Sequence, residues 1–415
     1  MGLFWIDNSK DIRINYNDLL NELVKEGHNN LFIYESNPYK VFVKILRNML
    51  GKRRCIILDA DFSNDELAGI GVSKENLENT SFFQEDLKSK FNSFNEILNF
   101  LKSNEDTLEI EIYTSGTTGR PKKVKQSFKN VIRAVKTNSD YKDNNWGFAY
   151  NPTHFAGLQV FFQALFNENK LVYIFDKDYS LIYNDIYTEK ISHLSCTPTF
   201  IKMLLPNIAE PINTMLNITF GGEKFDPRVE NKIKQKFPNA SVKNVYASTE
   251  AGSLLRAKGQ DFLIPNRYKG FIKIEDDELI IHKQLLGKSD SFVLDGEWYK
   301  TGDLVEFVNG NSFRFKTRKS EMINVGGYKV NPREVEEVIK DVNGVIDVIV
   351  FGRKNSVLGY IIAANVIKAD DEDKKELKLR INETCENKLQ EFKIPRIIKF
   401  VDSFEVTRTG KVKRT

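Results

Sequence analysis

From Leu108 onward, short apolar runs alternate with segments that have helical periodicity, such as Pro227–Lys236. The apolar runs are Leu108–Tyr113, Leu171–Phe175, Leu216–Phe220 and Val242–Tyr246. Strands that alternate with helices usually form a largely parallel sheet covered by those helices. The sequence therefore predicts an α/β architecture for this part of the chain.

The segments on either side of this alternation differ in character. Before it, Tyr39–Leu50 has the periodicity of an amphipathic helix and Cys55–Leu58 that of a strand, whereas Ser63–Ser93 is polar and irregular. After it, Phe271–Val308 is rich in short strand-like runs and turns, including Asp295-Gly296. This pattern is typical of antiparallel hairpins.

After Arg318 the pattern becomes that of a small α+β unit. Asn331 suits an N-cap, Pro332 suits the first helical position, and Glu334 lies in the acid-favouring first turn, so we expect a helix to begin there. The further expected elements are strands at Val345–Phe351, Tyr360–Val366 and Ile397–Val401 and a charged helix at Asp371–Leu389.

A chain of 415 residues is too long for one hydrophobic core, so we predict several domains. The expected boundaries are an N-terminal domain at 1–316, a hinge at 317–320 and a C-terminal domain at 321–415.

The net charge of +4 gives no support for broad nucleic-acid or membrane binding. Three widely spaced cysteines fit no disulfide framework or metal motif, which predicts a reducing, cytoplasmic location. No apolar run has the length of a membrane span.

The segment Tyr113–Val124, with the sequence YTSGTTGRPKKV, follows the first predicted strand. Its glycines allow the backbone to approach phosphate oxygens, to which its hydroxyls and N–H groups can donate, and its lysines add positive charge. Its spacing is not the GxxxxGK[ST] of P-loop kinases and ATPases, which disfavours that class. Composition alone also fits a polar surface loop.

This string resembles the signature of the acyl-adenylate-forming superfamily, which comprises acyl- and aryl-CoA synthetases, peptide-synthetase adenylation domains and firefly luciferase. The resemblance implies a large N-terminal adenylate-forming domain, with αβ layers of mostly parallel sheets plus a small β region, and a small mobile α+β C-terminal domain. It also implies that the loop binds the β- and γ-phosphates of ATP. The residues concerned are Thr114, Ser115, Gly116, Thr117, Thr118, Gly119 and Lys122.

Three later motifs, FGGE, YASTE and WYKTGD, resemble the rest of the family's nucleotide site in the family's order. The first implies that Gly221, Gly222 and Glu223 form the floor of the adenine site. The second implies that Tyr246, with Ala247 and Ser248 beside it, stacks on adenine. Ala247 stands where the family usually has glycine, which narrows the space there.

The same motifs imply roles for three acidic or hydroxyl side chains. Thr249 would reach the α-phosphate, and Glu250 would bind Mg²⁺, which prefers one or two carboxylates together with phosphates. Asp303 would contact the ribose, as acidic residues do in other nucleotide sites. A further match, in the segment Phe315–Val330, implies that Arg318 contacts the ribose as well.

Catalytic roles follow from the remaining matches. In NPTHFAG, His154 would lie beside the reacting carboxylate, and in TRTGK, Lys411 would bridge carboxylate, α-phosphate and ribose during adenylation. The loop that joins the site for thioester formation would contain Gly326, Gly327 and Tyr328. Ser320 occupies the hinge position, where relatives usually have Asp or Lys.

The resemblance implies an ATP-dependent acid–thiol ligase that uses ATP, Mg²⁺ and CoA. Amino-acid-activating relatives hold the α-amine with an Asp where this chain has Ala156, so we expect an aryl or short acyl acid instead. CoA ligases often have Trp where this chain has Leu358. A phosphopantetheine carrier protein or an amine therefore stays open as the acceptor, and a non-catalytic nucleotide-binding protein is the further alternative.

Overall fold

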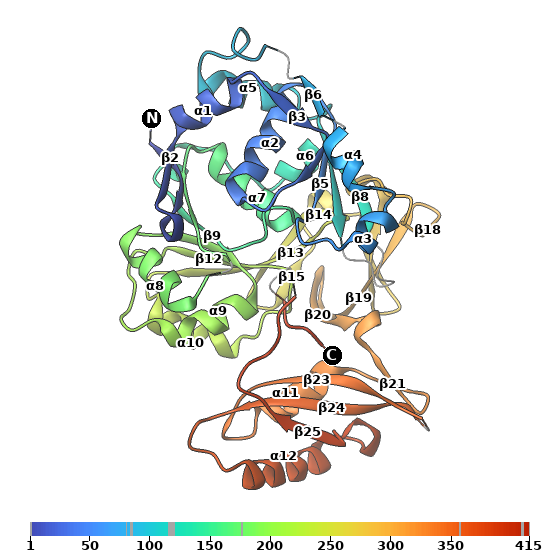
Figure 1. The fold of residues 1–415 in the computed structure, drawn as a ribbon. Helices are drawn as coiled ribbons and strands as arrows, with labels where there is room; N and C mark the ends of the chain where they lie inside the picture. Colours follow the sequence, from blue (N-terminus) through green and yellow to red (C-terminus); the bar gives the residue numbers. More distant parts are fainter. Residues whose placement is uncertain are drawn as a thin grey trace. The chain divides into compact units, whose positions relative to one another are not determined.

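The computed structural model describes residues 2–79, 81–83, 86–114, 121–175, 177–356, 358–407 and 411–414. The chain divides into two compact units. Unit 1 consists of Met1–Ile272 and Ile281–Tyr299, and unit 2 consists of Lys273–Ile280 and Lys300–Thr415. Figure 1 shows the helices and strands of both units.

Unit 1 contains a large mixed sheet whose centre is parallel. Its strands follow the order β15-β14-β13-β12-β11-β9-β10-β1-β2. Every pairing from β1 to β13 in this order is parallel, and β2, β14 and β15 add antiparallel edges. The strands are β1 (Leu3–Asp7), β2 (Ile12–Asn15), β9 (Asn145–Phe148), β10 (Lys170–Tyr173), β11 (His193–Cys196), β12 (Asn217–Phe220), β13 (Ser241–Ser248), β14 (Gly252–Lys258) and β15 (Asp261–Leu263).

A smaller sheet in the same unit carries the strands that flank the predicted phosphate loop. Its order is β4-β5-β7-β8, of which only the last pair is antiparallel. These strands are β4 (Phe32–Tyr34), β5 (Cys55–Leu58), β7 (Glu109–Thr114) and β8 (Lys122–Ser127). A separate antiparallel pair joins β3 (His28–Asn30) to β6 (Ser81–Phe83).

Helices cover both faces of the large sheet. Successive strand residues point to opposite faces, and accordingly Leu171 and Val172 belong to two different apolar clusters. Helices α1, α2, α5, α6 and α7 contribute to the first cluster, and α8, α9 and α10 contribute to the second (Figure 1). The helices of unit 1 are α1 (Tyr16–Val24), α2 (Pro38–Leu50), α3 (Asn64–Gly69), α4 (Lys74–Asn79), α5 (Phe94–Ser103), α6 (Phe128–Ile132), α7 (Phe155–Leu165), α8 (Tyr179–Thr188), α9 (Pro198–Leu204) and α10 (Arg228–Lys236).

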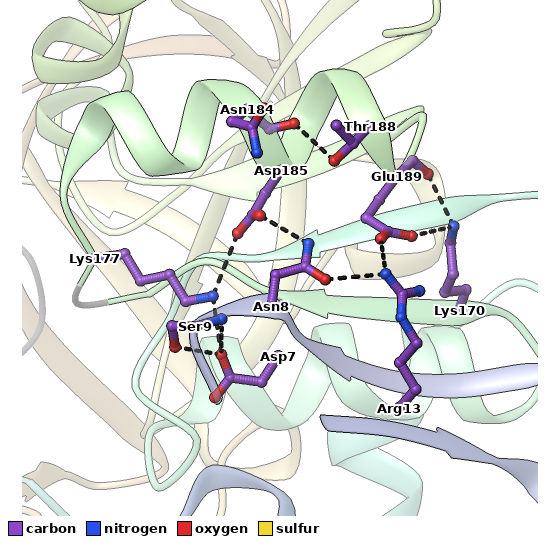
Figure 2. Close-up of polar contacts among 10 residues, drawn as sticks. All are labelled: Asp7, Asn8, Ser9, Arg13, Lys170, Lys177, Asn184, Asp185, Thr188 and Glu189. Atoms are coloured by element: carbon purple, nitrogen blue, oxygen red, sulfur yellow. Dashed lines mark hydrogen bonds and ion pairs between the residues drawn. The ribbon is translucent and has the colours of Figure 1, made fainter. Parts of the chain in front are cut away.

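An ionic network attaches the N-terminal β1–β2 hairpin to α8, to the start of β10 and to Lys177 between β10 and α8. Lys177 lies 3.0 Å from Asp7 and 3.3 Å from Asp185, and all three side chains are at most 6% exposed. Figure 2 shows this cluster beside a second one, in which Glu189 pairs with Arg13 and Lys170. Removing one member of such a buried group leaves an uncompensated charge, which is strongly destabilising.

Unit 2 contains two regions of sheet, and the pairs β19–β20 in the first and β23–β24 in the second are antiparallel. The first follows the order β16-β17-β19-β20, with β18 paired to β19, and the ends of β16, β17 and β19 and all of β18 belong to unit 1. The second follows the order β22-β21-β24-β23, with β25 added in parallel to β24. The strands are β16 (Ile272–Glu275), β17 (Glu278–His282), β18 (Leu294–Asp295), β19 (Trp298–Asn309), β20 (Ser312–Arg318), β21 (Ile323–Val325), β22 (Tyr328–Val330), β23 (Val345–Asn355), β24 (Gly359–Lys368) and β25 (Ile397–Phe400).

Two helices pack on the second of these sheets, α11 (Pro332–Lys340) and α12 (Lys374–Lys388). Helix α12 buries Leu377, Ile381 and Cys385, which lie on one face because they are spaced four residues apart. At the start of α11, the side chain of Asn331 accepts a hydrogen bond from the N–H of Arg333, so the predicted N-cap is confirmed.

The predicted α/β class is confirmed by the parallel order β10-β9-β11-β12-β13. The strand expected at Cys55–Leu58 is β5. The interpretation of Ser63–Ser93 as irregular was wrong, because this segment contains α3, α4 and β6. Helix α3 is short and begins with a capping box between Ser63 and Glu66, a local signal that the polar composition obscured.

Candidate active site

The predicted phosphate-binding loop joins two antiparallel strands of the smaller sheet. Thr114, the last residue of β7, pairs with Lys122, the first residue of β8. Ser115, Gly116, Thr117, Thr118 and Gly119 lie outside the described residues, so their roles stay predictions. The two ends of the loop are therefore fixed by a strand pair.

The Thr249–Glu250 pair lies in a turn between β13 and β14. Gly252 ends this turn with φ of +69°, a left-handed conformation that favours glycine. Within the turn, the N–H of Ala251 donates to Ser248 Oγ at 3.1 Å. Just before the turn, the ladder shifts register between Tyr246 and Ala247, and such bulges re-aim side chains.

A fully buried amide connects this turn to the strand that leaves the phosphate loop. Gln126 of β8 is 0% exposed, and its Nε2 donates to the carbonyl oxygens of Thr249 at 2.6 Å and Glu250 at 2.9 Å. The predicted Mg²⁺ ligand thus lies in a segment held against β8. The role of Gln126 was not predicted from the sequence, where its signal is a polar residue at an inward position of a strand.

The predicted adenine-site residues follow neighbouring parallel strands. Gly221 and Gly222 come directly after β12, which pairs with β13, the strand that contains Tyr246, Ala247 and Ser248. A Cβ on Gly221 would lie 3.1 Å from Val245 Cγ2, so glycine allows the two segments to approach closely. The carboxylate of Glu223 accepts hydrogen bonds from the N–H and Oγ1 of Thr199, in the first turn of α9.

His154 pairs with a buried carboxylate that sequence reasoning did not identify. His154 is the N-cap residue of α7, yet its side chain does not cap the helix, and its Nε2 lies 2.7 Å from Oδ2 of Asp59. Asp59 follows β5, and its Oδ1 accepts hydrogen bonds from Thr153 Oγ1 and from Asn151 Nδ2. Burial acts to raise the pKa of Asp59, but the contacts with His154, Thr153 and Asn151 outweigh it and the pKa is lowered. Asp59 is therefore an ionised partner for the imidazole.

In unit 2, the structure brings together the two residues predicted to contact ribose. Asp303 of β19 lies opposite Arg318 of β20, and Arg318 Nε donates to Asp303 Oδ1 at 2.7 Å. Asp303 is 1% exposed. The preceding Gly302 has φ of +75°, and its N–H donates to Glu278 at 2.7 Å. Asp303 is thus a buried carboxylate with a guanidinium beside it.

The predicted thioester loop is a tight turn between β21 and β22. Gly326 and Gly327 both have positive φ, +55° and +93°, which a two-residue hairpin turn requires. Tyr328 is 60% exposed, and its ring stacks on Phe392 with a centroid distance of 4.5 Å. Ser320, the predicted hinge residue, is exposed within the short 3-10 turn Lys319–Glu321.

Lys411 lies between two points at which the C-terminal segment is attached. On one side, the N–H of Lys411 donates to Thr407 Oγ1 at 3.2 Å, and Val406 forms a bridge to Val412. On the other side, Arg414 pairs with Glu336 of α11. The backbone of Lys411 is therefore restrained within unit 2.

Two segments of the chain match models of known protein families. Residues 40–270 match the AMP-binding enzyme family, and residues 334–411 match the AMP-binding enzyme C-terminal domain. The first match alone covers more than half of the chain.

This chain belongs to the AMP-binding enzyme family.

This AMP-binding enzyme is 27% identical over 344 residues to a protein named 2-succinylbenzoate–CoA ligase from Staphylococcus epidermidis, which covers 75% of this chain and 70% of the relative. Its fold is similar to that of ATP-bound MatB from Rhodopseudomonas palustris, with a TM-score of 0.72 and 18% identity over 99% of this chain and 94% of the other. It is also similar to MenE from Bacillus subtilis in complex with ATP and Mg²⁺, with a TM-score of 0.70 and 19% identity over 99% and 95%. The predicted superfamily and fold are confirmed.

Among the described residues of this AMP-binding enzyme, no helix has both the length and the apolar character needed to cross a membrane.

Proposed function

We propose that this AMP-binding enzyme is an ATP-dependent acid–thiol ligase. It joins a carboxylic acid to the α-phosphate of ATP, with release of pyrophosphate, and then transfers the acyl group from AMP to the thiol of CoA. Both half-reactions balance without a covalent enzyme intermediate. All three cysteines are buried, and none is needed as a nucleophile.

The observation that carries the proposal is the attachment of the Thr249–Glu250 turn to β8 by Gln126. Strand β8 begins at Lys122, immediately after the phosphate-loop sequence. A carboxylate and a hydroxyl are thereby held next to the strand that leaves a loop rich in glycine, hydroxyls and lysine. This is a suitable arrangement for a nucleotide triphosphate with its divalent cation.

The residues present fit Mg²⁺. Glu250 offers a hard oxygen ligand from a partly exposed position, and Mg²⁺ sites of this kind need only one or two carboxylates because phosphates and water complete the shell. The bound ion would neutralise charge on the phosphates. Thr249 would donate to the α-phosphate, and buried Asp303 would accept from the ribose hydroxyls.

In the first half-reaction, positioning and charge neutralisation do most of the work, since the acid's carboxylate attacks the α-phosphorus directly. We assign Lys411 to the developing charge on the α-phosphate, where its side chain would bridge the acid's carboxylate, the α-phosphate and the ribose. His154, held by Asp59, would lie beside the attacking carboxylate.

In the second half-reaction, we propose that the C-terminal part rotates about residues 317–320. Lys411 would leave, and the Gly326–Gly327 turn would enter the site so that the thiol reaches the acyl carbonyl. Ser320 suits this role because it is exposed in a short 3-10 turn, where a few dihedral changes can be absorbed.

The acid is proposed to be an aryl or short acyl acid without an α-amine. Ala156 in α7 is partly buried and packs against the apolar cluster. The α-ammonium group of an amino-acid substrate would therefore find a methyl group at this position instead of a carboxylate. The relative named 2-succinylbenzoate–CoA ligase makes 2-succinylbenzoate the first acid to test.

The acceptor is CoA, and a carrier-protein phosphopantetheine is the second candidate because Leu358 replaces the usual Trp. The three buried free thiols agree with a cytoplasmic location.

The test is acid-dependent pyrophosphate release from MgATP over a panel of aryl, short-chain and long-chain acids and amino acids, with and without CoA. We expect release with an aryl or short acyl acid and acyl-CoA only when CoA is present. Adenylation without consumption of CoA would indicate that the acceptor is a carrier protein. Nucleotide binding with no release for any acid would overturn the ligase proposal.

A further inference from the structure

The turn that contains the proposed Mg²⁺ ligand has the carbonyl groups of three consecutive residues held from one side. Thr249 O and Glu250 O accept from Gln126 Nε2, and Ala251 O accepts from Arg133 Nη1 at 3.1 Å. Gln126 lies in β8, and Arg133 directly follows α6, the helix after β8. One short segment downstream of the phosphate loop therefore binds the whole turn.

The two side chains are themselves fixed. Asn130 of α6 donates from Nδ2 to Gln126 Oε1 at 3.2 Å, which leaves the amide nitrogen of Gln126 facing the turn. Arg133 also contacts Asn130 Oδ1 and donates to the carbonyl oxygen of Leu285 at 3.3 Å. Burial lowers the pKa of the Arg133 guanidinium, and the neighbouring Tyr268 partly offsets this effect.

A third segment, around Gly287, also binds the turn. The N–H of Gly287 donates to Glu250 O at 2.8 Å, and Lys288 exchanges two backbone hydrogen bonds with Lys125. A Cβ on Gly287 would lie 2.6 Å from both Gln126 Nε2 and Lys125 O. Only glycine allows this segment to approach the turn so closely.

We propose that Gln126 and Arg133 are positioning residues that fix the Thr249–Glu250 turn to the segment following the phosphate loop, and thereby set the affinity for the divalent cation bound with ATP. The inference rests on the proposed role of Glu250 as a Mg²⁺ ligand. A divalent cation held by Glu250 would tolerate little error in the position of that carboxylate, since Mg²⁺ demands near-octahedral geometry at short distances. Without the hydrogen bonds from Gln126 and Arg133 to its carbonyl groups, the turn would move more freely, and the carboxylate of Glu250 would often lie outside the geometry that the ion requires.

The direct test uses Gln126→Met, which keeps the approximate side-chain volume and removes both donors. We would titrate Mn²⁺, as a paramagnetic probe, into the full-length enzyme saturated with α,β-methylene-ATP and follow free Mn²⁺ by electron paramagnetic resonance. Two lost hydrogen bonds predict at least roughly tenfold weaker Mn²⁺ binding. MgATP should show a similar rise in KM, and the KM for the acid should change far less.

Asn48→Leu is the matched control. Asn48 is also 0% exposed, and its amide binds Asn29 and the carbonyl oxygen of Asn30 in another part of unit 1. Both variants should melt at lower temperature than the parent, but only Gln126→Met should weaken Mn²⁺ binding. Equal weakening by the control, or Mn²⁺ affinity within twofold of the parent for folded Gln126→Met, would overturn the inference.

Glu250→Gln separates this inference from the proposed function. If Glu250→Gln weakens Mn²⁺ binding and Gln126→Met does not, the positioning role fails while the function stands. If Gln126→Met weakens Mn²⁺ binding and Glu250→Gln does not, the proposal that Gln126 acts through Glu250 fails. The proposed function is then tested separately by pyrophosphate release. Should Gln126→Met not fold, Arg133→Gln is measured in the same titration, with the same weakening expected and unchanged affinity as the overturning result.

Discussion

Nε2 of His154 lies 2.7 Å from Oδ2 of Asp59, although the two residues are 95 positions apart in the chain. Asp59 directly follows β5 of the smaller sheet, whereas His154 directly precedes α7 as its N-cap residue. The pair therefore joins the smaller sheet to the helical layer of unit 1, and it fixes the ring of a residue predicted to lie beside the reacting carboxylate.

Asp59→Ala should weaken both stability and use of the acid. The change leaves His154, Thr153 and Asn151 without their shared acceptor, which costs about 1–3 kcal/mol in the free energy of unfolding. We expect the KM for the acid to rise more than the KM for MgATP, because the imidazole loses its fixed orientation. Urea denaturation and pyrophosphate release check the two effects. An unchanged KM for the acid in a folded variant would contradict the role of the pair.

The same carboxylate should also respond to acid. Because the pKa of Asp59 is below its ordinary 3.8, its stabilising contribution is complete above about pH 4–5 and is lost as pH falls through the lowered pKa. The difference in unfolding free energy between the parent and Asp59→Ala should therefore shrink at acidic pH. A difference that stays constant down to pH 3 would speak against an ionised Asp59.

Lys411→Ala and Gly327→Val should separate the two half-reactions. Loss of the lysine removes charge stabilisation during adenylation, at a cost of about 3–4 kcal/mol, and should spare thioester formation from synthetic acyl-AMP. Gly327 has φ of +93°, which valine adopts only with strain, so its substitution should impair the thioester step instead. Assaying each half-reaction alone checks both assignments, and equal loss of both steps in either variant would refute that variant's assignment.

Lys177→Met should strongly destabilise unit 1. The variant leaves Asp7 and Asp185 buried without their cation, which costs about 3–5 kcal/mol in the free energy of unfolding. Lys129→Met is the control, because Lys129 and Asp106 form a solvent-exposed ion pair, which contributes little to stability. Chemical denaturation of both variants is the measurement. Losses of similar size would mean that burial does not govern the Lys177 cluster.

His193 should make the fold sensitive to mild acid. Burial, aided by Lys243, lowers the pKa of His193 from 6.5 to about 4. Between these values the unfolded chain binds a proton that the folded chain does not, so stability should fall as pH decreases from about 6.5 to about 4. His193→Gln should flatten this dependence in denaturation curves recorded at pH 7 and pH 5. The same loss in parent and variant would exclude His193 as the cause.

The local sequence pattern was sufficient to predict those helices and strands whose structure depends mainly on their own residues. Apolar runs gave the strands β5, β7 and β12 to within one residue, and the Asn331-Pro332 start of α11 is present as predicted. The polar segment before Phe94 was misread, because short helices such as α3 depend on caps more than on apolar periodicity. Boundaries of longer strands, such as β13, extend beyond the apolar run because partner strands complete their hydrogen bonds.

By itself, the sequence determined the α/β class, the family and the order of the motifs, since these depend on residue types and spacings within short segments. Only the tertiary structure decided which side chains hold the site residues in place. Asp59, Gln126 and Arg133 come from segments far from His154 and Glu250 in the chain, and buried polar groups must find partners wherever packing provides them. No local pattern specifies such a partner, because it is selected by the close approach of whole strands and helices.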